Sequence, residues 1–289
     1  MKLKEIYSSK KPVISYEVFP PKDDDSGEKL ENLMKELNLL KQYNPSLISV
    51  TYGAGGSTRG KSEKIVCRVK DELKITPMPH FTCVSTDKTT IRTYLKKLEN
   101  AGVKNILALR GDLPKDGICC HDFLHASDLI EFIKKESSLA VAAAGYPEGH
   151  IEAESLEKDI EYLKLKVEKG AEIIYTQLFF ENDKYFHFVE KCANARINVP
   201  VIPGILPVTS YKQLSKMTSL CRATIPYDFL DKIEQHSDDN DYVKKCGIEF
   251  TQKQCAELLK NGVQGLHFYT LNKSYAVSNI LENLRKSAG

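Results

Sequence analysis

Several polar side chains interrupt or directly follow apolar segments of this sequence. Glu17 lies within the apolar run 13–19, and Arg110 and Asp112 follow the apolar run 105–109, with one glycine between them. A carboxyl group in apolar surroundings is desolvated, which raises its pKa and lets it donate a proton near neutral pH. Glu17 is therefore a candidate general acid. Arg110 and Asp112 are candidates for binding or catalysis, unless they only pair with each other and stabilise the turn.

A phosphate-binding loop pattern, G-x-x-x-x-G-K-[ST], is matched by residues 55–62. The match follows an apolar segment and precedes a predicted helix, so a nucleoside triphosphatase is an alternative function. Such enzymes also hold Mg²⁺ with an Asp that directly ends an apolar strand. Here Arg110 and Gly111 intervene before Asp112, which weakens this interpretation. The G-x-G-x-x-G fingerprint of dinucleotide-binding folds is absent from the sequence.

The cysteines give little support for a metal site. Cys119, Cys120, His121 and His125 could in principle bind a metal, but they lack regular ligand spacing. The chain has 8 cysteines without a Cys-x-x-Cys pair, which fits reduced thiols in a cytosolic enzyme. We therefore expect no metal ion.

The composition is that of a globular protein, with 42% hydrophobic and 28% charged residues and a net charge of +2. So small a net charge indicates neither a nucleic-acid nor a membrane partner. The first five residues are not followed by an apolar signal segment, and no apolar run approaches the roughly 20 residues of a membrane span. We expect a cytoplasmic protein.

The candidate residues lie on a repeated alternation of apolar strands and amphipathic helices, with additional helices before the last strand. The predicted strands are 13–19, 47–52, 78–84, the apolar part of 105–114, 139–144, 172–180, 200–206 and 265–271. This pattern predicts a single (β/α)₈ barrel domain over residues 1–289, with a doubly wound open sheet as the alternative.

Polar residues recur inside or just past the carboxyl ends of these strands. They are Glu17, Thr51, Thr82, Arg110, Asp112, Tyr146, Gln177 and Tyr269. In a (β/α)₈ barrel this end carries the active site, whereas polar groups buried elsewhere would be costly. We therefore expect these side chains to converge on one site.

Motifs that contain these residues recur in order along nearly the whole chain and resemble those of 5,10-methylenetetrahydrofolate reductase. They are residues 15–21, 49–54, 79–83, 108–112, 146–148, 176–180, 202–207 and 267–272. The resemblance is to the short catalytic form, an FAD-dependent (β/α)₈ barrel without the regulatory domain of eukaryotic relatives. It also implies a homo-oligomer.

The resemblance implies two hydride transfers in ping-pong order. NAD(P)H would reduce FAD, and the reduced flavin would convert 5,10-methylenetetrahydrofolate to 5-methyltetrahydrofolate, which supplies methyl groups for methionine synthesis. Glu17 would protonate N10 to open the folate ring. Asp112 would stabilise the resulting iminium cation, and Gln177 would contact the bound substrate.

Further site residues are implied by the same resemblance. Those assigned to FAD are Thr51, Tyr52, Ala54, His80, Arg110, Gly111, Asp112, Ala126, Tyr146, His150, Ala153, Asp159 and Lys166. Lys166 would lie near the diphosphate and Asp159 near ribose hydroxyls. Alternatively, Lys166 is a solvated surface lysine and His80 fills the barrel interior. Gln213 and Lys273 are assigned to the folate, Lys273 opposite its glutamate carboxylates.

The chain departs from the family pattern at positions that concern both substrates. Lys273 stands where relatives often have Arg, and Met217 stands where they have a Phe that covers the dinucleotide. These changes lose bidentate carboxylate recognition and an aromatic stacking surface, respectively. The sequence therefore does not distinguish NADH, NADPH or a partner subunit as electron donor. A folate-binding barrel without catalysis is the non-enzymatic alternative.

Overall fold

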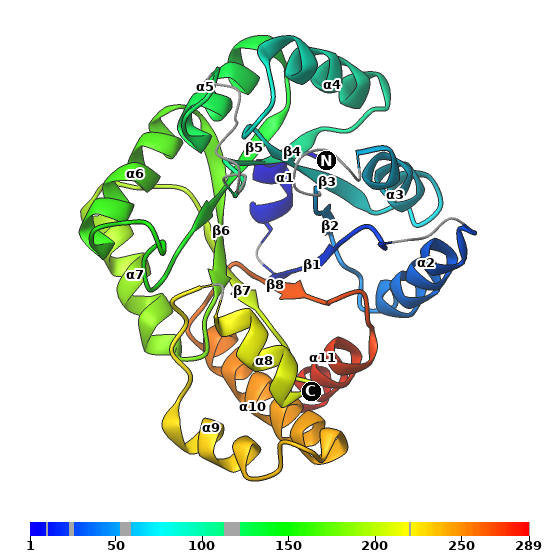
Figure 1. Ribbon diagram of the computed structural model, residues 1–289, viewed down its shortest axis with the longest axis vertical. Coiled ribbons are helices and arrows are strands. Elements are labelled where there is room, and N and C mark those ends of the chain that lie inside the picture. The colour runs from blue at the N-terminus through cyan, green and yellow to red at the C-terminus, as the bar shows by residue number, and fades with distance from the viewer. Residues whose placement is uncertain (10, 23–25, 53–58, 113–121, 220, 289) are drawn as a thin grey trace.

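The computed structural model describes residues 1–9, 11–22, 26–52, 59–112, 122–219 and 221–288. Its eight parallel strands pair in chain order and close into a barrel (Figure 1), which confirms the predicted (β/α)₈ fold. The strands are β1 (Val13–Val18), β2 (Leu47–Val50), β3 (Thr76–Thr82), β4 (Asn105–Leu109), β5 (Ala140–Gly145), β6 (Ala171–Leu178), β7 (Val201–Ile205) and β8 (Gly265–Tyr269). Pairing of β1 with β8 closes the barrel.

Helices surround the strands, and those between β7 and β8 are the additional helices that the sequence predicted (Figure 1). The helices are α1 (Leu3–Tyr7), α2 (Glu28–Lys41), α3 (Arg59–Asp71), α4 (Lys88–Asn100), α5 (Ala126–Glu136), α6 (Leu156–Glu168), α7 (Asn182–Asn194), α8 (Tyr211–Thr218), α9 (Tyr227–Glu234), α10 (Asn240–Lys260) and α11 (Tyr275–Ala288). None of the helices in these residue ranges is long and apolar enough to cross a membrane.

Side-chain caps fix the starts of the helices that carry predicted site residues. Ser155 accepts a hydrogen bond from the backbone N–H of Lys158 at the start of α6, and Ser210 accepts one from Gln213 at the start of α8. Such caps satisfy backbone donors that a helix start leaves unpaired, typically worth about 1 kcal/mol each. They therefore determine where α6 presents Asp159 and where α8 presents Gln213.

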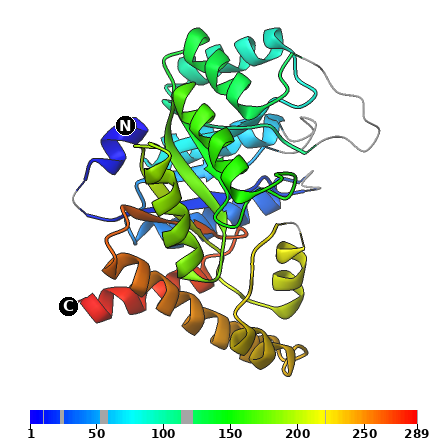
Figure 2. The ribbon, with the colours of Figure 1, turned by 90° about the vertical axis from the view of Figure 1, so that its left-hand side faces the viewer.

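Helix α1 closes the amino end of the barrel, and the sequence analysis did not predict it. Leu3, Ile6 and Tyr7 are buried there, and the Tyr7 hydroxyl lies 2.9 Å from that of Tyr175 on β6. Figure 2 shows α1, in blue, at this end of the molecule. A helix of 5 residues is too short for a recognisable amphipathic period, and its burial comes entirely from the barrel.

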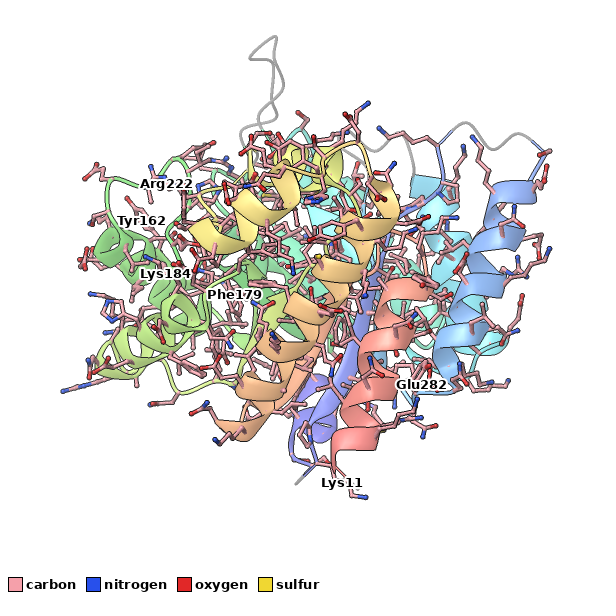
Figure 3. All side chains as sticks on the ribbon, turned by 90° about the horizontal axis from the view of Figure 1, so that it is seen from below. Lys11, Tyr162, Phe179, Lys184, Arg222 and Glu282 are labelled. Atoms are coloured by element: carbon pink, nitrogen blue, oxygen red, sulfur yellow. The ribbon has the colours of Figure 1, made fainter. Side chains whose placement is uncertain are left out.

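The opposite end of the barrel is formed by the carboxyl ends of the strands. In Figure 3, Lys11, just before β1, lies near the bottom, whereas Arg222, in the segment after α8, lies near the top. Several strands end two residues earlier than predicted, so that Thr51 and Tyr52 follow β2 rather than belonging to it. Of the polar residues predicted at strand ends, four follow their strands (Thr51, Arg110, Asp112 and Tyr146) and four lie among the last two residues of theirs (Glu17, Thr82, Gln177 and Tyr269).

A turn after β8 fastens two rim segments together. Leu271 and Asn272 adopt positive φ angles of 49° and 61°, which end the strand. The Asn272 side chain accepts a hydrogen bond from the Phe19 N–H (3.0 Å) and donates one to the Phe19 carbonyl (2.7 Å). This connection fixes the segment after β8, which carries Lys273, against the segment after β1.

Candidate active site

Glu17 lies on β1 between two buried histidines. Its Oε2 atom is 3.5 Å from His80 Nε2 on β3 and 3.8 Å from His267 Nε2 on β8. The side chains of His80 and His267 are only 6% and 1% exposed, and that of Glu17 is 20% exposed. The carboxyl group therefore meets both imidazoles with little intervening solvent.

The His267 ring is held by its own contacts. Its Nδ1 lies 2.8 Å from the Ser15 hydroxyl and its Nε2 3.5 Å from the Ser49 hydroxyl. The ring also packs against Tyr175, with 4.6 Å between the ring centroids. Because these partners come from three strands, the barrel framework itself orients the imidazole toward Glu17.

These histidines reverse the effect that the sequence predicted for Glu17. Burial raises the pKa of this carboxyl, as expected, but its interactions with His267 and His80 lower it by more. Its pKa therefore lies below the ordinary value, and the prediction of a raised pKa was wrong. Burial lowers the pKa of His80, although Glu17 opposes that shift. In these surroundings Glu17 is a carboxylate at neutral pH.

Asp112 is brought to the rim by a glycine that cannot be replaced without strain. Gly111 has a φ of +88°, and a Cβ there would lie 2.8 Å from Val84 Cγ1 and 2.9 Å from Thr82 Cβ. The Gly111 backbone thus packs closely against the side chains of Val84 and Thr82, and this packing sets the path of the chain after β4. Asp112 and Gln177 consequently line the same small cavity of about 140 Å³.

The predicted cofactor-binding residues converge on two larger cavities that share a wall. A cavity of about 490 Å³ is lined by Arg110, Ala126, Tyr146, His150, Ala153, Asp159 and Lys166. The neighbouring cavity, of about 330 Å³, is lined by Thr51, Tyr52, His80, Arg110, Gly111, Asp112, Tyr146 and His150. Every residue of this predicted set that the structure describes therefore lines one or both cavities. Ala54 lies outside the described residues.

Lys166 faces the larger of these cavities and is half-buried, so the alternative of a solvated surface lysine is wrong. Its Nζ donates a hydrogen bond to the Ala144 carbonyl (3.0 Å) and lies 5.8 Å from the centroid of the Tyr146 ring. Burial lowers the pKa of Lys166 and raises the pKa of nearby Asp159. Asp159 also accepts a hydrogen bond from the His150 backbone N–H (3.1 Å).

Arg110 lines all three of these cavities, but its partner is not Asp112. Its two terminal nitrogens contact the Glu152 carboxylate at 2.6 and 2.7 Å, a bidentate pair. The alternative that Arg110 and Asp112 only pair with each other is therefore wrong. Sequence reasoning missed Glu152 because it lies 42 positions away along the chain.

The residues assigned to folate lie around a separate cavity of about 390 Å³. Gln213 and Lys273 both line it, and so does Lys244 on α10, which the sequence analysis did not consider. The exposed side chains of Tyr162 and Leu165 likewise line the cavity of about 490 Å³ without having been predicted. No motif marks these positions, since each is one of many similar residues on a helix surface.

The phosphate-loop match finds no support where the structure describes it. Ser62, which would hold Mg²⁺ in such a loop, is 1% exposed and donates its hydroxyl proton to the Thr51 carbonyl at 3.0 Å. Residues 55–58 of the match lie outside the described residues, as do Cys119, Cys120 and His121. His125 is described and lines the cavity of about 490 Å³.

Fold and site together define a (β/α)₈ barrel with adjoining cavities, lined by charged and polar side chains, at the carboxyl ends of its strands. A family model described as methylenetetrahydrofolate reductase matches residues 2–285. The chain belongs to the methylenetetrahydrofolate reductase family.

Curated relatives agree with this assignment. The chain is 35% identical over 271 residues to 5,10-methylenetetrahydrofolate reductase of Escherichia coli, a match that covers 93% of this chain and 90% of the relative. It is 35% identical over 303 residues to methylenetetrahydrofolate reductase (NADH) 1 of Arabidopsis thaliana, covering 98% of this chain and 50% of the relative. The chain thus spans about half the length of the plant relative.

A solved structure shares the fold. It is an uncharacterized protein from Clostridium thermocellum that binds two copies of 5-methyl-5,6,7,8-tetrahydrofolic acid. The TM-score is 0.71, with 15% sequence identity, and the match covers 98% of this chain and 97% of that one. At this identity the likeness concerns the barrel architecture alone.

Proposed function

We propose that this chain reduces 5,10-methylenetetrahydrofolate to 5-methyltetrahydrofolate, with FAD as cofactor and NAD(P)H as electron donor. The observation that carries the proposal is the placement of the implied cofactor residues around two adjoining cavities beside Glu17. The family assignment gives the reaction class. The product would be a methyl donor for methionine synthesis.

The cavities contain groups that suit a flavin dinucleotide. The chemistry that FAD would supply here is hydride transfer between NAD(P)H and the folate. Lys166 is a cation available to a diphosphate, and Asp159 is a buried acceptor available to ribose hydroxyls. Arg110 is held by Glu152 in this structure, so its guanidinium is already oriented within the shared wall.

Glu17 would supply the proton for ring opening, although its pKa is low in these surroundings. A folate seated against the carboxyl would exclude water and bring N10 within reach, and both changes favour the protonated acid. His267 and His80 would then have a positioning role, since their rings fix the carboxyl at 3.8 and 3.5 Å. Proton donation is thereby tied to substrate binding.

Asp112 and Gln177 would act on the opened folate from the same cavity. Asp112 is exposed on the rim, where a carboxylate stabilises an iminium cation by its charge. Gln177 accepts a hydrogen bond from the Leu178 backbone N–H at 2.9 Å. That bond fixes the amide plane and leaves the two N–H donors and one lone pair of the amide available to a substrate.

The replacement of Glu17 by Gln separates catalysis from folate binding alone. The purified protein should show the absorption of an oxidised flavin, and NAD(P)H should bleach it anaerobically. Glu17→Gln should slow reoxidation of the reduced flavin by 5,10-methylenetetrahydrofolate at least about 100-fold, the usual contribution of a general acid. Bleaching by NAD(P)H should change far less.

Stopped-flow absorbance at the flavin maximum measures both half-reactions in one preparation. Undiminished folate reduction in the variant would contradict the role of Glu17. A colourless protein that takes up no FAD, or one that binds folate without oxidising the flavin, would contradict the proposed function.

A further inference from the structure

The barrel interior contains polar side chains where such barrels usually pack apolar ones. Ser15, Ser49, Tyr175 and His267 are all buried there and come from β1, β2, β6 and β8. Barrel interiors are mostly filled by Val, Ile and Leu, because buried polar groups are costly unless they are hydrogen-bonded. Glu17 follows Ser15 by two positions on β1, so both side chains leave the same face of the strand. This polar cluster is therefore in a position to act on Glu17.

The contacts of His267 favour one tautomer of its ring. Its Nε2 lies 3.8 Å from Glu17 Oε2 and 3.5 Å from the Ser49 hydroxyl. A carboxylate can only accept hydrogen bonds, so the neutral imidazole is best placed with its proton on Nε2. Nδ1 is then an acceptor, and the Ser15 hydroxyl, 2.8 Å away, donates to it. The tautomer of His267 and the direction of the Ser15 proton are therefore linked.

Ser15 has a second acceptor within reach. Its hydroxyl lies 3.4 Å from the Leu266 carbonyl, and a hydroxyl has only one proton to donate. If that proton turned to Leu266, His267 would carry its own proton on Nδ1. Its Nε2 lone pair would then face the Glu17 carboxylate, which is unfavourable. The favoured tautomer therefore requires that Ser15 keep its proton on Nδ1.

Tyr7, on α1, is the group that can hold Ser15 in this direction. Burial raises the pKa of Tyr7 to about 12, although the neighbouring Tyr175 and Ser15 hydroxyls lower it. Tyr7 is thus protonated at neutral pH, and its hydroxyl lies 2.9 Å from that of Tyr175. When Tyr175 donates to Tyr7, the Tyr7 proton is free for a lone pair of Ser15. Ser15 then directs its own proton to His267.

We propose that Tyr7 is a positioning residue that, through Ser15, holds the His267 proton on Nε2, facing Glu17. The inference rests on the proposed function, in which Glu17 is the acid for ring opening. It gives α1, which is seen within the ring of strands in Figure 1, a part in the reaction at the other end of the barrel. Tyr175 assists through its hydroxyl and through its ring, which packs on His267 with 4.6 Å between the centroids.

NMR of the histidine ring nitrogens in the isotope-labelled full chain reads the tautomer without turnover. The native chain should carry the His267 proton on Nε2 near neutral pH, and His267→Asn identifies the signals. Tyr7→Phe removes only the hydroxyl and should raise the fraction with the proton on Nδ1 about threefold or more, the effect of one lost neutral hydrogen bond. Tyr175→Phe, a second variant, should change this fraction in the same direction.

The pH dependence of flavin reoxidation by the folate is the second measurement. With less of the Nε2 proton directed at it, the Glu17 carboxylate is less stabilised. The falling limb of the profile should therefore move to higher pH by roughly 0.5 pH unit in Tyr7→Phe. His80 and Tyr269, the other titratable groups that face Glu17, are unchanged in this variant.

Tyr185→Phe is the matched control, because Tyr185 is as buried as Tyr7 and its hydroxyl donates to the Val201 carbonyl at 2.8 Å. It should lose a similar amount of stability in urea and leave both the tautomer and the falling limb in place. A native His267 with its proton on Nδ1, an unchanged tautomer in Tyr7→Phe and Tyr175→Phe, or an equal change in Tyr185→Phe would overturn the inference.

The two measurements also separate this inference from the proposed function. A tautomer that depends on Tyr7 in a chain that reduces no folate would overturn the proposed function and leave the control of His267 by Tyr7 standing. Folate reduction by a chain whose tautomer ignores the Tyr7 hydroxyl would do the reverse.

Discussion

At the scale of single residues, the site depends on a carboxylate whose charge is set by two histidines. Burial alone would make Glu17 a weak acid, but His267 and His80 lie close enough to lower its pKa below the ordinary value. A group with a lowered pKa in the folded state contributes stability at pH values above its unfolded pKa. This contribution is lost as the pH falls through the folded-state pKa.

Replacement of His267 by Asn should raise the pKa of Glu17, because an interaction that lowers this pKa is lost while burial persists. If protonated Glu17 is the acid, folate reduction falls as the pH rises through its pKa. The falling limb of the pH profile should therefore move to higher pH in the variant. The position of this limb is measured by following single-turnover reoxidation of the reduced flavin across the pH range.

The same variant should lose about 1–3 kcal/mol of stability at neutral pH, since the Ser15 and Ser49 hydroxyls lose their shared partner. His236→Asn, at an exposed histidine on a distant helix end, is the control and should change neither quantity. A falling limb that stays in place or moves to lower pH would argue against the proposed link between His267 and Glu17.

At the scale of elements, the turn after β4 decides where two site residues lie. Gly111→Ala introduces a Cβ within 3 Å of the side chains of Val84 and Thr82 at a φ of +88°. The positive φ should cost about 1 kcal/mol, and the forced shift of the packed neighbours about 1–3 kcal/mol more. Urea unfolding measures the loss, and FAD titration should show weaker binding because Arg110 and Asp112 move with the turn.

Gly262→Ala separates these two costs. Gly262 has a φ of +78°, similar to that of Gly111, but no atom lies within 4 Å of the position its Cβ would take. The Gly262→Ala variant should therefore lose only the stability that a positive φ costs a residue with a side chain. Its FAD binding should be unaltered. Equal losses in the two variants would show that packing around Gly111 does not position the turn.

The elements also show what sequence reasoning could recover. Strands, helices and the convergence of rim residues followed from local periodicity and from the geometry of a closed barrel, whereas Asp159 and Lys166 were implied only by the family resemblance. Helix α1 was too short to have a pattern. Glu152 and Lys244 were missed, and the pKa of Glu17 was misjudged, because each depends on a neighbour supplied by a distant part of the chain.

At the scale of the whole molecule, the proposed cofactor site joins the first half of the barrel to α6. Its walls come from the segments after β2, from β3 and β4, and from α5, β5 and α6. A ligand in both cavities would contact elements that otherwise meet mainly through the strands. Because such a ligand binds only the folded chain, its binding free energy adds to the free energy of unfolding.

FAD at 100 times its dissociation constant should therefore stabilise the apoprotein by about 2.7 kcal/mol, which for a chain of this length is a rise in Tm of roughly 4–5 °C. Lys166→Met should reduce this rise, because Lys166 is a cation available to the diphosphate. Riboflavin lacks the diphosphate and should therefore stabilise the variant and the native chain equally. Lys164→Met, on the same helix but outside the cavity, is the control. Calorimetry with each ligand measures these shifts.

If riboflavin and FAD stabilise equally, or if Lys164→Met weakens the FAD effect as much as Lys166→Met, the assignment of Lys166 to the diphosphate is wrong.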